Sequence, residues 1–472
     1  MSRRRGKALA TVTAAMLALP AAARAQRARC DWLPRSDSTH STTENIPGGV
    51  SRTFVGGGVL VKCPGRGITL RGDSAEVYQD KYYIIGRVAY DEPRLAMTSD
   101  FLTYFPAEER VVATATPPGS VNAKLPSGST LVGPVAEYRR AIPKTRPRAQ
   151  ILALGRPTIT IIQKDSTGKP MPPMTVVAQQ VFMDGDSLLY GGGQVSISRP
   201  EILAKGDSVF LDTSRETMRL MRTPRIDGKR EKPFSLTGEL IDLYSRNRKL
   251  EHVLSRGKAT ATSQDMVLKA DTIDLRVVND LLDRAIAWGK TLRAHATSPA
   301  QNVTADSIVV SMPQQRVRLI RALRQAFAEA KPDTVRFRVE APDTTDVIAG
   351  DTIVARFDTL PPKDTTKGPS VEQIVATGHA KSQYHFAVND TAVHRPAISY
   401  VRARQITIDF AKASVATVSA KDSVVGLYLE PTADTVRAGA KASGTSGQQR
   451  PQSPPIKSVI PLPPRPPASH PQ

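Results

Sequence analysis

The sequence predicts an all-β fold, an elongated and edge-open solenoid made of repeated two-strand units. Three observations predict it: a motif with the strand period of two occurs ten times, a Gly-x-Val signature recurs between the copies, and two distant segments share one register. The chain has 472 residues, of which 40% are apolar and 23% charged. This composition is sufficient for a hydrophobic core.

The repeated motif has an apolar residue, a small residue two positions later, usually Asp next, and apolar residues at offsets five and seven. Because the step from offset two to offset five is odd, a straight strand would turn the second half to the opposite face. We therefore expect the chain to bend within each copy. The copies begin at Leu70, Met97, Leu131, Val176, Ala204, Leu236, Leu268, Val303, Ile348 and Val401.

The small residue and the Asp suit a corner, because the side chain is short and the carboxylate can accept hydrogen bonds from nearby backbone N–H groups. Six copies carry Asp at this position. A metal site is the alternative, but the acidic residues occur once per unit, without the spacing of an EF-hand or a calcium-binding nonapeptide. We expect corner residues and no metal.

A second signature, Gly followed two positions later by a small or β-branched residue, precedes most copies by 11 to 14 residues and indicates a second strand in each unit. Residues 317–330 resemble a basic helix when they are considered alone. Residues 317–326, however, match 250–259 position by position, with Arg324 in place of Gly257. The repeat therefore predicts strands here. The signature occurs at Gly57, Gly86, Gly119, Gly193, Gly257 and Gly289.

The ends of the chain differ from the repeats. Residues 1–25 combine a basic start, a short apolar run and small residues before Gln26, which predicts a signal peptide cleaved before Gln26 and export to an oxidising compartment. An uncleaved membrane anchor is the alternative. We expect 26–49 to be an N-terminal arm, 50–430 to hold the repeats, and 431–472 to be a disordered Pro-rich tail. The tail would be a spacer, a partner-binding polyproline segment or a solvated end.

Two features of this organisation stay open at the level of sequence. Cys30 and Cys63 are the two cysteines, and in an oxidising compartment a disulfide between them would tie the arm to the first strands. The longer spacing over 139–173 is compatible with a loop inserted in one jellyroll or with a break between two jellyrolls in series.

The charge balance indicates an anionic partner. The chain carries a formal charge of +21, and without the five cations of the first 25 residues, Lys and Arg still outnumber Asp and Glu by 16. Aromatic residues make up only 5%, which argues against a lipid-embedded barrel with aromatic girdles and against an RNA-binding module that stacks bases. We expect contact with phosphate or another anionic surface, and no nucleic acid.

We find no motif for catalysis. The seven histidines are scattered without zinc-binding spacing, and neither a Gly-x-Ser-x-Gly elbow nor a phosphate-binding loop is present. We expect a protein that is not an enzyme and has no catalytic residues, cofactor or metal. A site assembled across a solenoid, as in polysaccharide lyases, is the enzymatic alternative.

The pairing of a Gly-x-Val strand with an apolar-x-Ala-Asp-Ser/Thr strand, behind a signal peptide, resembles the organic-solvent-tolerance (OstA-like) family of periplasmic lipopolysaccharide-transport proteins. The resemblance covers most of 50–430. It implies a twisted open β-jellyroll without enzymatic activity, which shields lipopolysaccharide acyl chains in an apolar groove. It also implies inner- and outer-membrane transport components as partners, and end-to-end association through edge strands.

The resemblance, combined with the repeat register, implies a set of lipid-contacting residues in the N-terminal copies. Ten units exceed what a simple bridge needs, which is compatible with one unusually long jellyroll or two in series. No large barrel follows the repeats, so a bridge role is favoured over a translocon role. The alternative is a secreted or surface β-solenoid that binds polysaccharide or acts as an adhesin. The expected lipid-contacting residues are Leu70, Ala75, Val77, Met97, Leu102, Tyr104, Leu131, Tyr138, Val176, Val181 and Met183.

Overall fold

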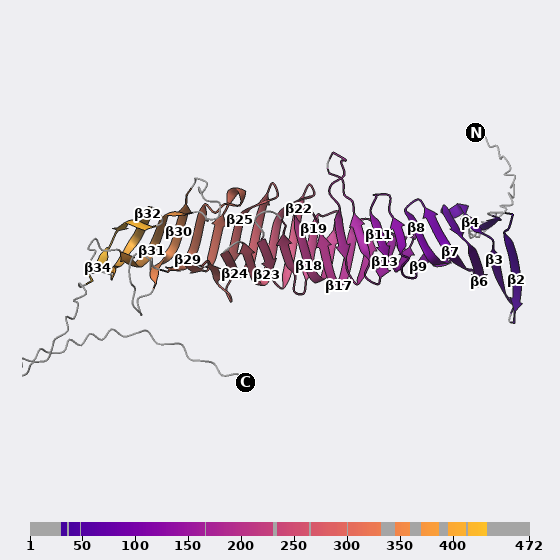
Figure 1. Cartoon of the computed structure of the whole chain (residues 1–472), viewed down its shortest axis with the longest axis horizontal. Helices are drawn as coiled ribbons and strands as arrows, with labels where there is room; N and C mark the ends of the chain where they lie inside the picture. Colours follow the sequence, from indigo (N-terminus) through magenta and orange to yellow (C-terminus); the bar gives the residue numbers. More distant parts are fainter. Residues whose placement is uncertain are drawn as a thin grey trace, which may run out of the picture.

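The computed structural model is an elongated stack of antiparallel strands (Figure 1). It describes residues 30–431 except 35–36, 48, 166, 230–233, 264–265, 300, 332–344, 359–369, 387–394 and 412–413. The predicted signal peptide and nearly all of the predicted Pro-rich tail lie outside these residues. Over the described part, the predicted all-β fold is confirmed, with 34 strands, two 3-10 helices and no α-helix. No helix there is long and apolar enough to cross a membrane.

The strands of the N-terminal half are β1 (Asp31–Pro34), β2 (His40–Ile46), β3 (Val50–Gly56), β4 (Val59–Cys63), β5 (Ile68–Gly72), β6 (Ser74–Tyr78), β7 (Lys81–Glu92), β8 (Leu95–Phe105), β9 (Arg110–Thr114), β10 (Val121–Lys124), β11 (Thr130–Gly133), β12 (Val135–Arg139), β13 (Gln150–Leu154), β14 (Thr158–Ile161), β15 (Met174–Val177), β16 (Gln180–Asp184) and β17 (Leu188–Ser198).

The strands of the C-terminal half are β18 (Ile202–Asp212), β19 (Thr217–Met221), β20 (Arg225–Gly228), β21 (Phe234–Thr237), β22 (Leu240–Arg246), β23 (Lys249–Ser263), β24 (Met266–Val278), β25 (Leu281–Trp288), β26 (Ala294–Thr297), β27 (Gln301–Ala305), β28 (Ser307–Ser311), β29 (Leu319–Ala330), β30 (Asp346–Phe357), β31 (Val371–Phe386), β32 (Ala397–Ala411), β33 (Ser414–Lys421) and β34 (Val425–Leu429). The 3-10 helices are η1 (Pro64–Arg66) and η2 (Pro313–Gln315).

Each long strand contributes to two half-sheets that meet at a bend. Strand β7 shows the arrangement, because its first half pairs with β6, its second half pairs with β5, and the register shifts between Ile85 and Val88. We call the column of such bends the corner line. The half-sheets diverge from this line, so that their inner faces enclose the interior and their outer ends form two rows of turns, the lips.

The two lips are defined by the turns that they contain. The first lip holds the turns at 79–80, 213–216, 247–248 and 279–280, and the second lip holds those at 93–94 and 199–201 together with the loop 162–173. The described strands cross the corner line from one lip to the other or end there. The interior therefore faces solvent only between the lips or at the two ends of the stack.

The corner line explains both sequence signatures. Gly86 has a φ of 74°, Arg87 follows with a φ of 44°, and a Cβ on Gly86 would lie 2.6 Å from the Asp73 carboxylate. The second signature therefore belongs to the bend that packs against the preceding corner. A separate strand begins after Gly57 and Gly119, whereas Gly86, Gly193 and Gly257 each lie within one bent strand. The same double left-handed bend occurs at 155–156, 193–194, 222–223, 257–258, 324–325, 378–379 and 422–423.

The Asp side chains stabilise the bends in the expected way. Both Asp271 oxygens accept hydrogen bonds from the backbone, with N···O distances of 2.8 Å to Lys290 and Thr291 and 2.9 Å to Leu292. Asp73 instead binds the Arg87 guanidinium at 2.8 Å. The carboxylate thus either accepts hydrogen bonds from backbone N–H groups or forms an ion pair with a cation of the opposing bend.

Residues 317–330 confirm the register argument over the local helical pattern. They contain β29, which pairs with β28 in its first half and with β27 in its second. Arg324 occupies the left-handed position that Gly257 occupies in β23, with a φ of 62°. Tertiary pairing therefore determines this segment, not helix propensity.

The region 139–173 is not a break in the sheet. Strand β12 pairs with β13, and β11 pairs with β14, so both half-sheets continue through it. The extra residues lie at the lips, as loops 140–149 and 162–173. The described chain therefore forms one continuous jellyroll.

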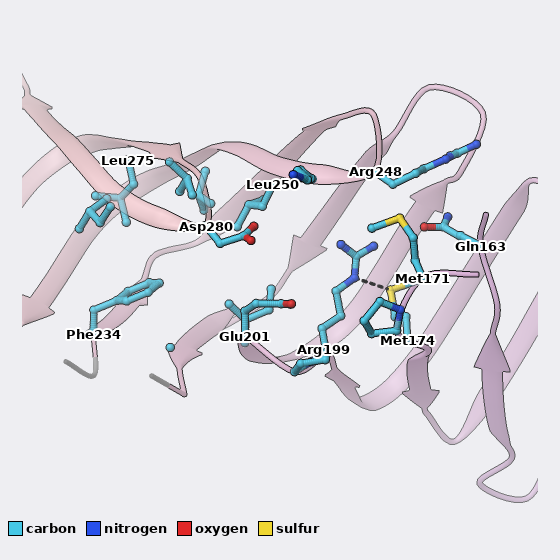
Figure 2. A pocket seen from close by; sticks show the side chains of 18 of the residues that line it. Gln163, Met171, Met174, Arg199, Glu201, Phe234, Arg248, Leu250, Leu275 and Asp280 are labelled. Atoms are coloured by element: carbon cyan, nitrogen blue, oxygen red, sulfur yellow. Dashed lines mark hydrogen bonds between the residues drawn. The ribbon is translucent and has the colours of Figure 1, made fainter. Parts of the chain in front are cut away.

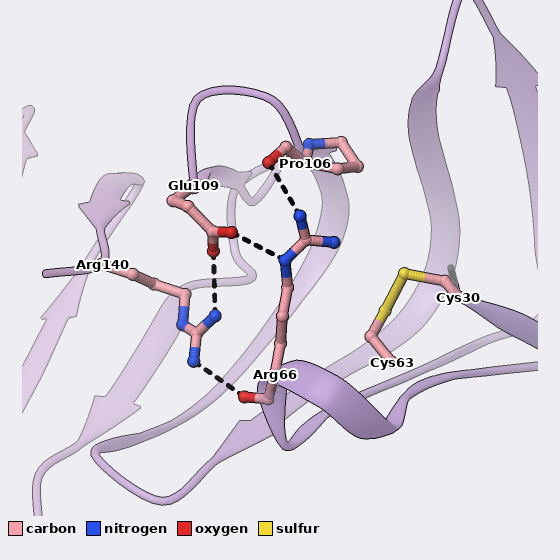
Figure 3. Close-up of a disulfide and its surroundings, with 6 residues drawn as sticks. All are labelled: Cys30, Cys63, Arg66, Pro106, Glu109 and Arg140. Atoms are coloured by element: carbon pink, nitrogen blue, oxygen red, sulfur yellow. Dashed lines mark hydrogen bonds and ion pairs between the residues drawn. A yellow bond between two sulfur atoms is a disulfide. The ribbon is translucent and has the colours of Figure 1, made fainter. Parts of the chain in front are cut away.

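The N-terminal arm is attached to the first turn of the stack. Strand β1 pairs with β4, and Cys30 forms a disulfide with Cys63, which answers the question that the sequence left open (Figure 3). Next to it, the Arg66 Nε donates to Glu109 at 2.7 Å, and Glu109 also accepts from Arg140 at 2.9 Å. This network joins η1 to two turns of the first lip.

Candidate functional site

The repeat register places the side chains on both sides of each corner toward the interior. Of the eleven residues predicted to contact lipid, ten are buried and Val77 is partly buried, whereas Arg71, one position out of register, is exposed. Their inward position follows the register, and contact with lipid stays a prediction. The buried ten are Leu70, Ala75, Met97, Leu102, Tyr104, Leu131, Tyr138, Val176, Val181 and Met183.

In the N-terminal copies, large aromatic side chains fill the interior. Trp32 of the arm stacks on Tyr82 with ring centroids 5.6 Å apart, and Tyr82 contacts Tyr104 at 6.0 Å. Burial raises the pKa of Tyr104 to about 12, so its hydroxyl stays protonated at neutral pH. These rings pack against one another in the N-terminal part of the interior.

A polar network lies beside these rings at the lips. Glu92, whose side chain is 2% exposed, accepts hydrogen bonds from the hydroxyls of Tyr90 and Tyr138 and from Arg140. Burial is the main reason that the pKa values of both tyrosines are raised. The buried carboxylate is therefore fully compensated by protein groups.

The interior opens into a cavity in the middle of the stack. The cavity has a volume of about 250 Å³ and lies between the lips, because it is lined by turns of both (Figure 2). Its walls are mostly apolar. From the second lip come Ile161, Met171, Met174, Ile202 and Phe234, and from the first come Leu250, Val253, Leu275, Val277 and Leu282.

Loop 162–173 forms one wall of the cavity. It follows β14 and leads into β15, and it carries Gln163, Met171 and Pro172 to the cavity surface. The loop accounts for part of the unusually long spacing between the repeat copies at Leu131 and Val176. That spacing was the signal in the sequence that this part of the lip differs from the rest.

Arg199 is one of three cationic residues that line this cavity, together with Arg248 and Lys249. It lies in the turn between β17 and β18, and its Nε donates to the Met174 sulfur at 3.4 Å (Figure 2). Among the described residues, no carboxylate forms an ion pair with it. Burial lowers the pKa of the Arg199 guanidinium, the nearby Glu201 carboxylate opposes this shift, and Arg248 adds to it.

The second arginine at the opening, Arg248, already binds groups of the protein. The Arg248 side chain donates to the carbonyl of Thr213 and lies 3.6 Å from a Glu216 oxygen. It therefore stabilises the turns of the first lip. The repeat consensus could not identify either arginine, because both lie in lip turns, outside the repeated positions.

The C-terminal end of the stack presents an open edge. Strand β34 pairs with β32, and all five of its residues are exposed, including Val425 at 70% and Leu427 at 57%. An apolar edge strand of this kind can pair with a further strand.

Within the described ranges, no group of three or more His, Cys, Asp or Glu side chains is arranged to hold a metal ion. No family model matches the chain, and no curated protein matches its sequence.

Proposed function

We propose that the chain is a periplasmic carrier that shields the acyl chains of lipopolysaccharide, or of a related anionic amphiphile, and helps to move it from the inner to the outer membrane. The observation that carries this proposal is the apolar cavity between the lips. A closed solenoid core would have no such opening, whereas an amphiphile needs an apolar interior and a seam through which its head group reaches water.

The size of the cavity suits one acyl chain. Burial contributes about 0.8 kcal/mol per CH₂ group, so a dozen carbons supply enough free energy for binding. The observed 250 Å³ is slightly below the roughly 300–1,000 Å³ of typical ligand pockets. A lipid with several chains therefore requires the lips to separate further.

The ends of the stack support a bridging role. Each end of the described stack has an exposed edge strand, the polar β2 at the N-terminal end, which pairs with β3, and the apolar β34 at the other end. An exposed edge strand supports pairing with a membrane-transport component or with a second copy of the chain. The resemblance to the OstA-like family favours the same arrangement.

A photo-crosslinking residue tests the proposal at two adjacent valines. Val277 lines the cavity, and Val278 is 54% exposed to solvent. In host cells, we expect the probe at Val277 to capture lipopolysaccharide or a related amphiphile, detected as a mass shift, and the probe at Val278 to capture none. Capture at both positions would indicate a nonspecific apolar surface, and capture at neither in folded protein would contradict the carrier function.

A second candidate is polysaccharide binding by the outer face. Phe182, Tyr190 and Phe210 lie side by side on β16, β17 and β18, with ring centroids 6.0 and 4.8 Å apart, and Tyr190 is 43% exposed. Such a row of rings can stack on sugars. This function would be favoured if Tyr190→Ala abolished retention on a polysaccharide column while the Val277 probe captured no lipid.

A further inference from the structure

The guanidinium of Arg199 lacks strong hydrogen-bond acceptors among the described residues that line the cavity. A guanidinium has five N–H donors and no acceptor. The described residues offer it one weak acceptor, the Met174 sulfur. A partly buried cation that forms no ion pair is energetically unfavourable, which favours an anion at this site.

The backbone holds Arg199 in place independently of its side chain. Its N–H donates to the Ile202 carbonyl at 3.0 Å, and its own carbonyl accepts from the Lys229 ammonium at 3.1 Å. Pro200 follows directly and restricts the turn. The guanidinium is therefore carried by a fixed turn, as a preorganised binding group requires.

Of the two arginines that line the cavity, Arg199 is the one available to an anion, and the exposed Lys249 is a further cation in the lining. Glu216 compensates Arg248, and the Lys229 ammonium binds the Ser198 hydroxyl at 2.8 Å in addition to the Arg199 carbonyl. Glu201 also lines the cavity but forms no ion pair with Arg199. A single oxyanion would thus meet one unpaired guanidinium.

We propose that Arg199 binds the phosphate of a lipid head group at the opening of the cavity. A guanidinium can form two parallel hydrogen bonds with phosphate oxygens, which gives a strong and directional contact. The inference rests on the proposed carrier function, because the chains of the same lipid would occupy the cavity. It adds that the carrier selects phosphorylated amphiphiles over neutral ones.

The arrangement also fixes the orientation of the lipid. Arg199 lies in a turn of the second lip, while Phe234 and Leu275 form an apolar group further along the stack (Figure 2). Strands β17, β18, β20 and β21 connect these positions by successive pairing. The phosphate therefore binds at the second lip, and the chains extend toward β21 and β24.

The test compares two short-chain lipids with identical acyl chains, dihexanoyl phosphatidic acid and dihexanoylglycerol, together with inorganic phosphate. Binding to the delipidated full-length chain is measured by calorimetry. We expect phosphatidic acid to bind at least about tenfold more tightly than dihexanoylglycerol, because a charge-assisted bidentate contact contributes more than 1.4 kcal/mol. Inorganic phosphate alone should bind much more weakly than phosphatidic acid.

Two variants separate a local contact from net charge. Arg199→Gln should lose the preference for phosphatidic acid and keep its affinity for dihexanoylglycerol. Arg215→Gln removes the same charge from a side chain that is 83% exposed in a first-lip turn, and it should retain the preference. Since Arg199→Gln removes a partly buried charge that forms no ion pair, its melting temperature should equal or exceed that of the wild type.

The binding measurements distinguish a failure of the carrier function from a failure of the phosphate site. If neither lipid binds the wild-type chain, the carrier function is wrong and the phosphate site with it. If both lipids bind equally and Arg199→Gln changes nothing, the carrier function stands and the phosphate site is wrong. Binding of inorganic phosphate as tight as that of phosphatidic acid would assign the site to the free ion, and a large fall in the melting temperature of Arg199→Gln would assign Arg199 a structural role.

Discussion

Asp271 shows at the residue scale what the corner carboxylates do. Its two oxygens accept three backbone N–H groups of the segment that follows β25. These hydrogen bonds hold the pKa of Asp271 below its ordinary value, with the bond from Thr291 as the main cause. The carboxylate is thus a local cap on a bend, as the position of Asp in the repeat predicted.

The lowered pKa leads to a pH-dependent prediction. A carboxyl group with a lowered folded-state pKa stabilises the fold above its unfolded-state pKa of about 4, and this contribution is lost as the pH falls through the folded-state value. Asp271→Asn should therefore lower the urea midpoint at pH 7, with a deficit that shrinks below about pH 4. Asp186→Asn, at a side chain that is 74% exposed, is the control. A deficit independent of pH would refute the cap, and bound calcium lost in the variant would reveal a metal site.

Single residues were predictable from sequence where the repeat determines them. The offsets placed Leu70 and Leu102 inside and Arg71 outside, and the structure agrees. Arg199 could not be found in this way, because its position depends on the length and course of two lip turns. That Arg199 forms no ion pair can be known only from the tertiary structure, which determines the side chains around it.

At the scale of the element, strand β29 shows that register outweighs local propensity. Its sequence contains strong helix formers, yet pairing with β27, β28 and β30 makes it a bent strand. The bend requires a left-handed conformation, which Gly257 and Gly378 adopt in β23 and β31. Arg324 adopts it with an exposed side chain and therefore carries backbone strain.

Replacing this arginine with glycine should stabilise the strand. We expect Arg324→Gly to raise the free energy of unfolding by about 1 kcal/mol, since the strain of a left-handed non-glycine residue exceeds the entropic penalty of glycine. Denaturant unfolding measures the change. The reverse change in β23, Gly257→Ala, should destabilise, because a Cβ there would lie 2.6 Å from the Glu239 carboxylate. If Arg324→Gly is destabilising, the contacts of the arginine side chain stabilise the fold by more than its left-handed backbone destabilises it.

The whole molecule is a groove whose filling varies along its length. The sequence predicted the elongated all-β stack, because that shape follows from a repeat in which each unit is buried by its neighbours. It could not predict where the interior is open, because a cavity depends on the difference between enclosed space and side-chain volume. The aromatic rings of Trp32, Tyr82 and Tyr104 fill the N-terminal interior, while the inserted loop 162–173 helps to frame the cavity.

Because the interior is packed at the N-terminal end and open at the cavity, two alternatives predict different lipid contacts. A carrier with a continuous path binds lipid along the whole stack, whereas a protein with one fixed site binds it at the cavity. A bridge must pass its lipid along the stack, so the lips must separate even where the interior is now packed. Photo-crosslinking residues at Met97, Leu102 and Val277 should then all capture lipid in host cells, and those at Arg71 and Val278 should capture none. Met97 and Leu102 are buried and Arg71 is exposed, so the contrast between neighbouring positions excludes nonspecific labelling. Capture at Val277 alone, in variants that retain the wild-type melting temperature, would show a fixed binding site and would rule out transport through the N-terminal copies.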